Sequence, residues 1–437
     1  MCYAIPGRVK EIQDKRVIVD YFGEEKKALN EFYDLRVGDY ICAQGGYVIK
    51  KVSPQEAESI LSAWSELFFD LQSIDLRLSR LDFQGQKIDK KLRLILDRAL
   101  EKTQLSKEDL LYLFNLHKVT DINLLFKVAN FLRHKFHKNS CCVHGIIEIS
   151  NSCQRLCSYC GISADNKEIK RYRMSAEEIV NIATEAVKKY GFQALVLQSA
   201  EDPTYTVKDL AAIIKKIKEQ VEVLIGISFG EVGLDGLREL YQAGARAILL
   251  RFETSNPEIY KRLHPGRTLD SRLNHIKKAY EIGYLIMTGA LIGLPGQSDE
   301  DIINDLYLTK ALGAEMYSFG PFLSHPDTPL RNYSAVSEEK VLKTLALARI
   351  IDPENSKILV TTAFETLSSE ARKKGLVCGA NSVMLNITPL EYRKLYSIYP
   401  NKAYSTTIID KQIEETIALL KSLGRAPTDL GIAQDVK

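Results

Sequence analysis

The chain has 437 residues, of which 26% are charged, and its formal net charge is +3 with the two signs interspersed. It has no basic block and no interleaving of arginine with aromatic residues, which argues against nucleic-acid binding, and no apolar run of about 18 residues that could span a membrane. A chain of this length predicts two domains unless one of them is a large barrel.

The N-terminal 75 residues predict a small β module. Short β-rich runs are separated by turn residues such as Gly23 and Gly45. Five strands at this spacing favour a small, closed OB-like barrel. The runs cover residues 7–12, 16–21, 26–30, 40–43 and 47–52. Ser53 as N-cap and Pro54 in the first turn then predict a helix through residues 57–71.

A charged connector follows, with helical patterns over residues 74–81, 88–100, 107–116 and 122–137. We divide the chain into the module (1–75), a helical linker (76–104) and a large domain (105–437). The adjacent Cys141 and Cys142 are interpreted as packing residues, with redox pairing as the less favoured alternative. Eight scattered cysteines do not form a disulfide framework, and no signal peptide precedes them, so we expect a reducing cytoplasmic location.

From residue 144 onward, apolar β runs alternate with amphipathic helical patterns. The expected strands cover residues 144–152, 194–199, 222–229, 246–253, 285–294, 315–322, 357–364 and 381–388. The expected helices lie near residues 175–190, 206–220, 234–243, 269–282, 298–312, 337–351, 366–374 and 391–398. Eight βα repeats predict an α/β fold, the (β/α)8 TIM barrel, whose active sites lie at the C-terminal ends of the strands.

The first of these strands runs into Cys153, Cys157 and Cys160, which have a C-x3-C-x2-C spacing. Thiolates suit iron–sulfur clusters, which are normally held by four cysteines. Three ligands would leave one iron open to a substrate or cosubstrate, so the spacing indicates a catalytic [4Fe-4S] cluster. The alternative, a zinc knuckle, would need a fourth Cys or His close by, and residues 161–170 contain neither.

Arg251 and Glu253 alternate with Phe252 near the end of the fourth expected strand, so both should point the same way. Buried charges are costly unless they are paired or bind a ligand. They could form an ion pair on the barrel wall, or they could bind a zwitterionic cosubstrate.

With Tyr159 just before the last cysteine, the motif resembles the signature of the radical S-adenosylmethionine (SAM) superfamily. The resemblance implies that SAM chelates the open iron and that one electron cleaves it to methionine and a 5'-deoxyadenosyl radical. It also implies an oxygen-sensitive centre and a reductant such as ferredoxin or flavodoxin.

The opening Met1-Cys2-Tyr3-Ala4-Ile5-Pro6-Gly7-Arg8-Val9 is similar to the HypC/HupF family of hydrogenase maturation chaperones, as is Val37-Gly38-Asp39-Tyr40. These proteins carry an iron fragment on the cysteine after the initiator Met, which implies a possible second iron at Cys2. Gln44 stands where the family usually has histidine.

Residues from about 105 to 437 resemble the HydE-type maturases of [FeFe]-hydrogenase and, more distantly, biotin synthase and methylornithine synthase. The motifs that carry the resemblance begin at Lys170, Leu197, Glu253, Gly293, His325 and Cys378. The resemblance implies contacts to SAM from Tyr159, Ser199, Glu253, Arg272, Met316 and Pro321. It implies a substrate cavity lined by Gln198, Arg251, Thr361, Thr362, Met384, Tyr396 and Tyr399. Three positions depart from the family: His144 replaces an arginine, Gly226 replaces a threonine, and residues 403–406 lack the first cysteine of an accessory cluster.

The leading hypothesis is therefore a radical SAM enzyme that acts on a small cysteine-derived or iron-bearing substrate in hydrogenase metallocofactor assembly. Hydrogenase maturation proteins are the expected partners. One alternative keeps the barrel but changes the substrate to an amino acid or a related metabolite. Another is a non-catalytic iron carrier or scaffold.

Overall fold

The computed structural model describes residues 5–83 and 87–430, so Cys2 lies outside the described residues. Near the N-terminus, five strands form the predicted closed barrel, in the order β1-β2-β3-β5-β4. They are β1 (Gly7–Gln13), β2 (Arg16–Tyr21), β3 (Glu24–Leu29), β4 (Tyr40–Gln44) and β5 (Tyr47–Val52). Val17 and Val19 alternate with more exposed residues on β2 and fill the interior.

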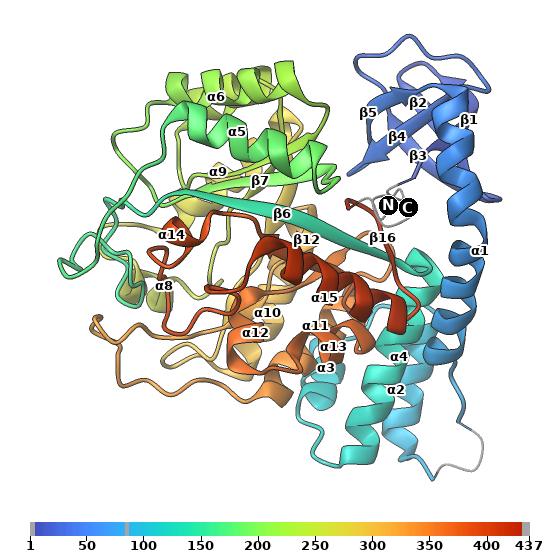
Figure 1. Ribbon diagram of the computed structural model, residues 1–437. Helices are drawn as coiled ribbons and strands as arrows, with labels where there is room; N and C mark the ends of the chain where they lie inside the picture. The colour runs from blue at the N-terminus through green and yellow to red at the C-terminus, as the bar shows by residue number, and fades with distance from the viewer. Residues whose placement is uncertain (1–4, 84–86, 431–437) are drawn as a thin grey trace.

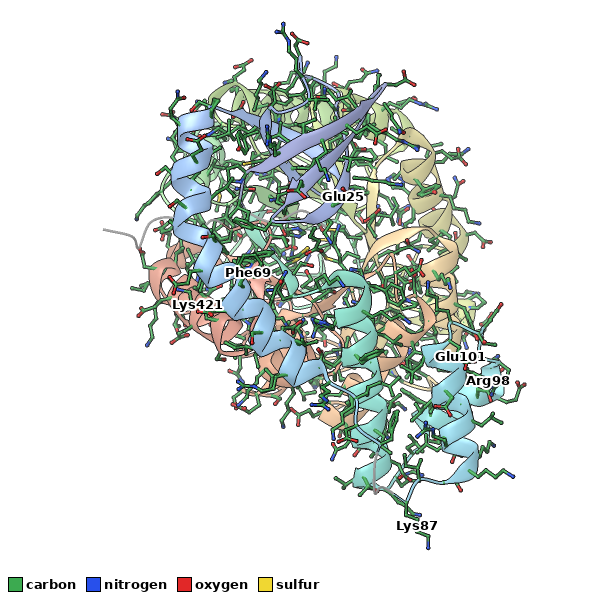
Figure 2. All side chains as sticks on the ribbon, turned by 90° about the vertical axis from the view of Figure 1, so that its right-hand side faces the viewer. Glu25, Phe69, Lys87, Arg98, Glu101 and Lys421 are labelled. Atoms are coloured by element: carbon green, nitrogen blue, oxygen red, sulfur yellow. The ribbon has the colours of Figure 1, made fainter. Side chains whose placement is uncertain are left out.

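Helix α1 (Pro54–Ser79) begins where the sequence predicted, with Ser53 Oγ accepting a hydrogen bond from the Glu56 amide at 3.2 Å. It runs without interruption through residues that the periodicity divided between two helices. Figure 2 shows α1 extending along the outside of the molecule, from the small barrel near Glu25 toward the connector helices near Lys87.

The far end of α1 is anchored by the buried Asp75. Both terminal nitrogens of Arg133 donate to its carboxylate, at 2.7 and 2.8 Å, and Arg425 Nε lies 3.1 Å away. Burial by itself would raise the pKa of Asp75, but these cations and His134 lower it to about 2. This ion cluster joins α1 to the connector and to the C-terminal segment.

The connector contains α2 (Lys90–Leu100), α3 (Lys107–Phe114) and α4 (Val119–His137). Leu92 and Ile95 of α2 are buried in the same hydrophobic cluster as residues of the large barrel. Helix α2 is therefore packed onto the large barrel through apolar side chains.

Eight parallel strands close into the predicted TIM barrel, because β15 pairs both with β14 and with β6. In chain order they are β6 (Ser140–Ser150), β7 (Ala194–Ser199), β8 (Leu224–Ser228), β9 (Ala245–Leu249), β10 (Leu285–Thr288), β12 (Ala314–Tyr317), β14 (Lys357–Val360) and β15 (Ser382–Asn386). A short strand, β16 (Ala426–Pro427), pairs with the start of β6 on the outside of this closure.

Amphipathic helices surround the strands, and the main core lies between the two layers. The surrounding helices are α5 (Ala176–Lys188), α6 (Val207–Gln220), α7 (Leu234–Gln242), α9 (Leu269–Ile282), α10 (Asp299–Ala311), α11 (Glu338–Ile351), α13 (Ala371–Val377) and α15 (Ile409–Ser422). Shorter elements lie at the strand ends: α8 (Pro257–Leu263), α12 (Thr362–Leu367), α14 (Leu390–Arg393), and the paired β11 (Leu291–Ile292) and β13 (Gly320–Pro321).

Some boundaries differ from the sequence-based expectation. Strand β9 ends at Leu249 rather than 253, and β14 ends at Val360 before α12 begins at Thr362. After Leu249 the apolar run continues into a loop in which Leu250 and Phe252 are buried, and after Val360 it continues into helix α12. Burial alone does not make a strand. No element was expected after residue 398, where the structure has α15 and β16.

The small barrel is docked on the N-terminal ends of the TIM-barrel strands, the face opposite the loops that carry the cysteines (Figure 1). Gln44 donates to Gln193 Oε1 at 2.6 Å, and Glu31 pairs with Arg246 at 3.0 Å. Tyr47 Oη donates to the carbonyl of Gly283 at 3.3 Å. Across residues 5–83 and 87–430, no helix combines the length and the hydropathy needed to cross a membrane.

Candidate active site

The cysteine loop follows β6 at the C-terminal mouth of the barrel, and one arginine organises its backbone. Arg171 Nη1 donates to the carbonyls of Asn151 at 2.7 Å and Ile162 at 2.8 Å. Its Nη2 donates to the carbonyls of Ser163 at 2.6 Å and Asn166 at 2.9 Å. Four carbonyls satisfied by one planar guanidinium hold the loop in a single conformation.

The loop also fits closely against its surroundings. A Cβ at Gly161 would lie 2.2 Å from the carbonyl oxygen of Ser397, so only glycine fits this approach. Tyr159 Oη lies 3.2 Å from His264 Nε2, and its ring meets Phe322 edge-on at a centroid distance of 5.7 Å. The residue before the third cysteine therefore packs between α8 and the segment after β13.

Cys153, Cys157 and Cys160 form no disulfide and are partly exposed. Burial of the sulfur atoms raises the pKa of all three thiols, that of Cys160 to about 12. The neighbouring thiols raise the pKa of Cys157 further, which indicates that the three sulfur atoms face a common space. A positively charged centre in that space would be required to hold all three as thiolates.

A cavity of about 280 Å³ opens beside this loop at the same end of the barrel. Ten of the residues singled out from the sequence line it. They are Gln198, Ser199, Arg251, Glu253, Arg272, Thr361, Thr362, Met384, Tyr396 and Tyr399. Thus β7, β15, α9, the loop after β9, the start of α12 and the segment after α14 bring the expected side chains to one space.

Arg251 and Glu253 both line the cavity and form an ion pair, with Nη2 and Oε2 3.1 Å apart. The expectation that they share a direction is confirmed, but both lie beyond the end of β9. Glu253 has a φ of +67°, a left-handed conformation that is costly for a residue with a side chain. The bridge from Glu253 to Ala290 stabilises this turn.

A second charged group links the cavity to the cysteine loop. Arg272 Nε lies 2.9 Å from Glu231 Oε1, and its Nη2 lies 3.8 Å from Glu201 Oε1. Glu201 also pairs with Arg155, which is part of the cysteine loop. Neither Glu201 nor Glu231 was expected among the site residues.

Glu148 and Lys402 were also missed. They form a buried ion pair that lines the cavity. Burial lowers the pKa of Lys402, and the Glu148 carboxylate opposes this effect. Glu148 Oε2 has no hydrogen-bond partner among the described residues. The charge of Glu148 within the apolar run 146–149 was the available signal, whereas nothing local marks Lys402.

Two expected SAM contacts lie elsewhere. Met316 lines a separate, lower cavity in the barrel interior, and Pro321 is buried in β13, paired with Ile292. The lower cavity is also lined by His144 and Gly226, two of the positions that depart from the family pattern.

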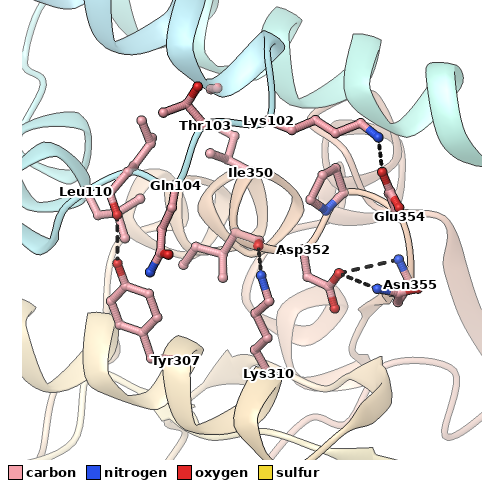
Figure 3. Close-up of a pocket in the computed structure, with 14 residues that line it drawn as sticks. Lys102, Thr103, Gln104, Leu110, Tyr307, Lys310, Ile350, Asp352, Glu354 and Asn355 are labelled. Atoms are coloured by element: carbon pink, nitrogen blue, oxygen red, sulfur yellow. Dashed lines mark hydrogen bonds and ion pairs between the residues drawn. The ribbon is translucent and has the colours of Figure 1, made fainter.

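A larger cleft of about 500 Å³ lies between the connector and the α10 and α11 helices (Figure 3). Several of its polar groups are already paired: Lys310 donates to the Ile351 carbonyl at 2.8 Å, and Tyr307 to the Leu105 carbonyl at 3.2 Å. It contains none of the residues singled out from the sequence.

The parallel barrel and its cysteine loop define a radical SAM enzyme. The Radical SAM superfamily matches residues 147–307, and the Biotin and Thiamin Synthesis associated domain matches residues 308–426. The HupF/HypC family matches residues 1–64.

Within the superfamily, the chain belongs to the family of the [FeFe] hydrogenase maturase subunit HydE. It is 38% identical to HydE of Thermotoga maritima over 328 residues, which cover 75% of this chain and 93% of that one. It is 29% identical to 3-methylornithine synthase of Methanosarcina acetivorans over 76% of this chain and 93% of that one.

Solved structures agree with this assignment. The crystal structure of methylornithine synthase (PylB) matches with a TM-score of 0.67 and 26% identity, over 76% of this chain and 97% of that one. The maturase HydG from Carboxydothermus hydrogenoformans matches with a TM-score of 0.67 over 84% of this chain and 85% of that one, and at 23% identity it supports the fold alone.

The superfamily implies a [4Fe-4S] cluster and SAM. The residues present fit the cluster, because three thiols that form no disulfide face one space on a loop fixed by Arg171. Cys153, Cys157 and Cys160 would hold it.

Proposed function

We propose that this chain cleaves SAM reductively and acts on a small cysteine-derived or iron-bearing substrate during hydrogenase metallocofactor assembly. The observation that carries the proposal is the cavity beside the cysteine loop, into which ten of the expected side chains project. When bound, the cluster supplies the electron that cleaves SAM to methionine and a 5'-deoxyadenosyl radical.

The residues of the chain bind and orient the reactants. Ser199, Glu253 and Arg272 are the proposed contacts to SAM, and the carboxylate of Glu253 suits its amino group. The guanidinium of Arg251 suits a substrate carboxylate, because arginine binds carboxylates through two parallel hydrogen bonds. Exchange of the Arg251–Glu253 ion pair for these ligand groups would keep both buried charges paired.

The remaining cavity wall is proposed to bind the substrate. Gln198 Nε2 donates to Tyr396 Oη at 3.2 Å, which orients both polar groups. Thr361, Thr362, Met384 and Tyr399 line the same cavity. Such a mixed lining fits a small polar substrate rather than a long apolar one.

The test is anaerobic reconstitution with iron and sulfide, addition of dithionite and SAM, and measurement of 5'-deoxyadenosine. We expect product from the natural chain and none from Cys157→Ala. Glu253→Gln should keep the cluster but weaken SAM binding by about tenfold or more, as loss of one charged hydrogen bond would. An intact cluster that yields no 5'-deoxyadenosine would leave the non-catalytic iron carrier as the better explanation.

A second candidate is a radical SAM enzyme for an amino acid or a related small metabolite. It is favoured by the likeness to 3-methylornithine synthase, 29% identical over 76% of this chain. The paired charges of Arg251 and Glu253 would also suit an amino-acid zwitterion. Turnover of lysine or dethiobiotin in the same assay would support it.

We further propose that the N-terminal module handles a second iron at Cys2, that hydrogenase maturation proteins are its partners, and that ferredoxin or flavodoxin reduces the cluster. The match to the HupF/HypC family supports this context. Eight cysteines scattered over 437 residues, too few and too dispersed for a disulfide framework, fit the proposed cytoplasmic location.

A further inference from the structure

A second group of metal-ligating side chains lies at the opposite end of the TIM barrel. Cys142 and His144 are two residues apart on β6, so their side chains project to the same face. Asp429 follows β16, which pairs with the start of β6. One ligand atom from each of these three buried residues lies within 4.8 Å of the other two.

Local hydrogen bonds hold the group together. His144 Nε2 and Asp429 Oδ2 are 3.2 Å apart, and the amide of Val143 donates to the same oxygen at 3.2 Å. Thr428 Oγ1 lies 2.9 Å from Asp429 Oδ2 and 3.4 Å from Cys142 Sγ. The carboxylate is therefore fixed between the imidazole and the thiol.

This set can be read as an ordinary buried ion pair with a cysteine beside it. Two observations point instead to a ligand. His144 is only 8% exposed, yet its Nδ1 has no hydrogen-bond partner among the described residues. His144 also lines the lower cavity, whose volume of about 20 Å³ is enough for one ion or water molecule beside the ring, whereas Cys142 and Asp429 do not line it.

The three donor groups indicate which class of metal ion could bind here. A thiolate, an imidazole and a carboxylate together suit a divalent first-row transition metal such as iron, cobalt or zinc rather than magnesium or calcium. Ligand atoms of a tetrahedral site lie roughly 3.4–3.8 Å apart, given metal–ligand distances of about 2.0–2.3 Å. A movement of about an ångström would bring the three side chains to that spacing.

The small barrel covers this site. Gln44 donates to the carbonyl of Thr428, the neighbour of Asp429, and Gly45 lines the same cavity as His144. Along β6, Cys142 and Glu148 are six residues apart, about 20 Å at the rise of a parallel strand. The group is thus remote from the cysteine loop and lies at the contact between the two barrels.

We propose that Cys142, His144 and Asp429 bind one divalent transition-metal ion at this contact, separately from the [4Fe-4S] cluster. The inference is independent of the radical chemistry, because the three proposed metal ligands belong neither to the cysteine loop nor to the lining of the cavity beside it. A metal there would add a thiolate bond to the hydrogen bonds that already join β6 to the C-terminal segment.

The test is Co²⁺ titration of the full chain carrying Cys2→Ala, Cys153→Ala, Cys157→Ala and Cys160→Ala. These substitutions leave only the buried Cys42, Cys141 and Cys378 as thiols besides Cys142. We expect one Co²⁺ per chain with a thiolate-to-cobalt charge-transfer absorption. Adding Cys142→Ser should abolish that absorption and weaken binding at least tenfold. The matched control, Cys141→Ser, removes the adjacent thiol and should change neither. Equal absorption with and without Cys142, or no binding in this background, would overturn the proposal.

A second measurement needs no substitution. Crystals of the natural chain soaked in Co²⁺ should give an anomalous difference peak at the cobalt edge between Cys142, His144 and Asp429. A cobalt peak only at the cysteine loop or on the surface would also overturn the proposal. Neither result bears on SAM cleavage, so failure here and failure of the proposed function are distinguishable.

Discussion

Replacing Arg171 by methionine should release the cysteine loop without removing a cluster ligand. Four loop carbonyls accept hydrogen bonds from this guanidinium, at 2.6 to 2.9 Å. Each hydrogen bond to a charged group contributes about 1.5–3 kcal/mol, but water can replace part of this at a half-buried site. We therefore expect a net loss of about 3 kcal/mol, roughly a hundredfold in the ratio of ordered to released loop.

The assay is the rate at which an iron chelator strips the reconstituted cluster under anaerobic conditions, together with iron and sulfide content. Arg171→Met should lose its cluster far faster than the natural chain. Lys170→Met is the matched control, because it removes the same charge from the adjacent, exposed side chain. Equal stripping rates for the two variants would refute the role assigned to Arg171.

Three further predictions concern titration, modularity and stability. Burial raises the pKa of Asp305 to about 7. Its contribution to stability is therefore full below about pH 4 and is lost as the pH rises through 7. Asp305→Asn should accordingly flatten the fall in Tm between about pH 4 and 7, and an unchanged fall would contradict this. Cys2→Ala should leave 5'-deoxyadenosine formation intact while lowering iron loading of the N-terminal module; lost cleavage would count against the separation of the two barrels. Asp75→Asn leaves buried guanidinium groups without a counter-charge and should lower the free energy of urea unfolding by about 3–5 kcal/mol, whereas a loss below about 1 kcal/mol would show that the cluster is dispensable.

The docking of the small barrel argues against a simple role as a tethered carrier that reaches the cysteine loop. A tethered carrier raises the effective concentration of its cargo wherever the tether reaches. Here, however, the small barrel is fixed on the N-terminal mouth, and the cysteine loop lies at the C-terminal mouth (Figure 1). The barrel interior between them is filled by an apolar layer that includes Met287, Met316 and Met384. We expect mutations at Gln44 and its neighbours to weaken the contact between the small barrel and the TIM barrel rather than SAM cleavage.

The sequence by itself determined both folds, the order of the barrel strands and of the main helices before residue 398, and the cysteine loop. Hydrophobic alternation, capping residues such as Ser53, and the spacing of Cys153, Cys157 and Cys160 are local patterns, and they act through neighbours in the chain. The location of the site residues at the strand ends could also be predicted, because a parallel barrel gathers the C-terminal ends of its strands at one mouth.

Only the tertiary structure decided which distant residues meet. Glu148 pairs with Lys402, 254 residues away, and His144 meets Asp429, 285 residues on. Gln44, expected only as a departure from its family, became a contact to Gln193 and Thr428. Such meetings depend on strand register, barrel closure and the docking of one domain on another, none of which leaves a periodic signal in the chain.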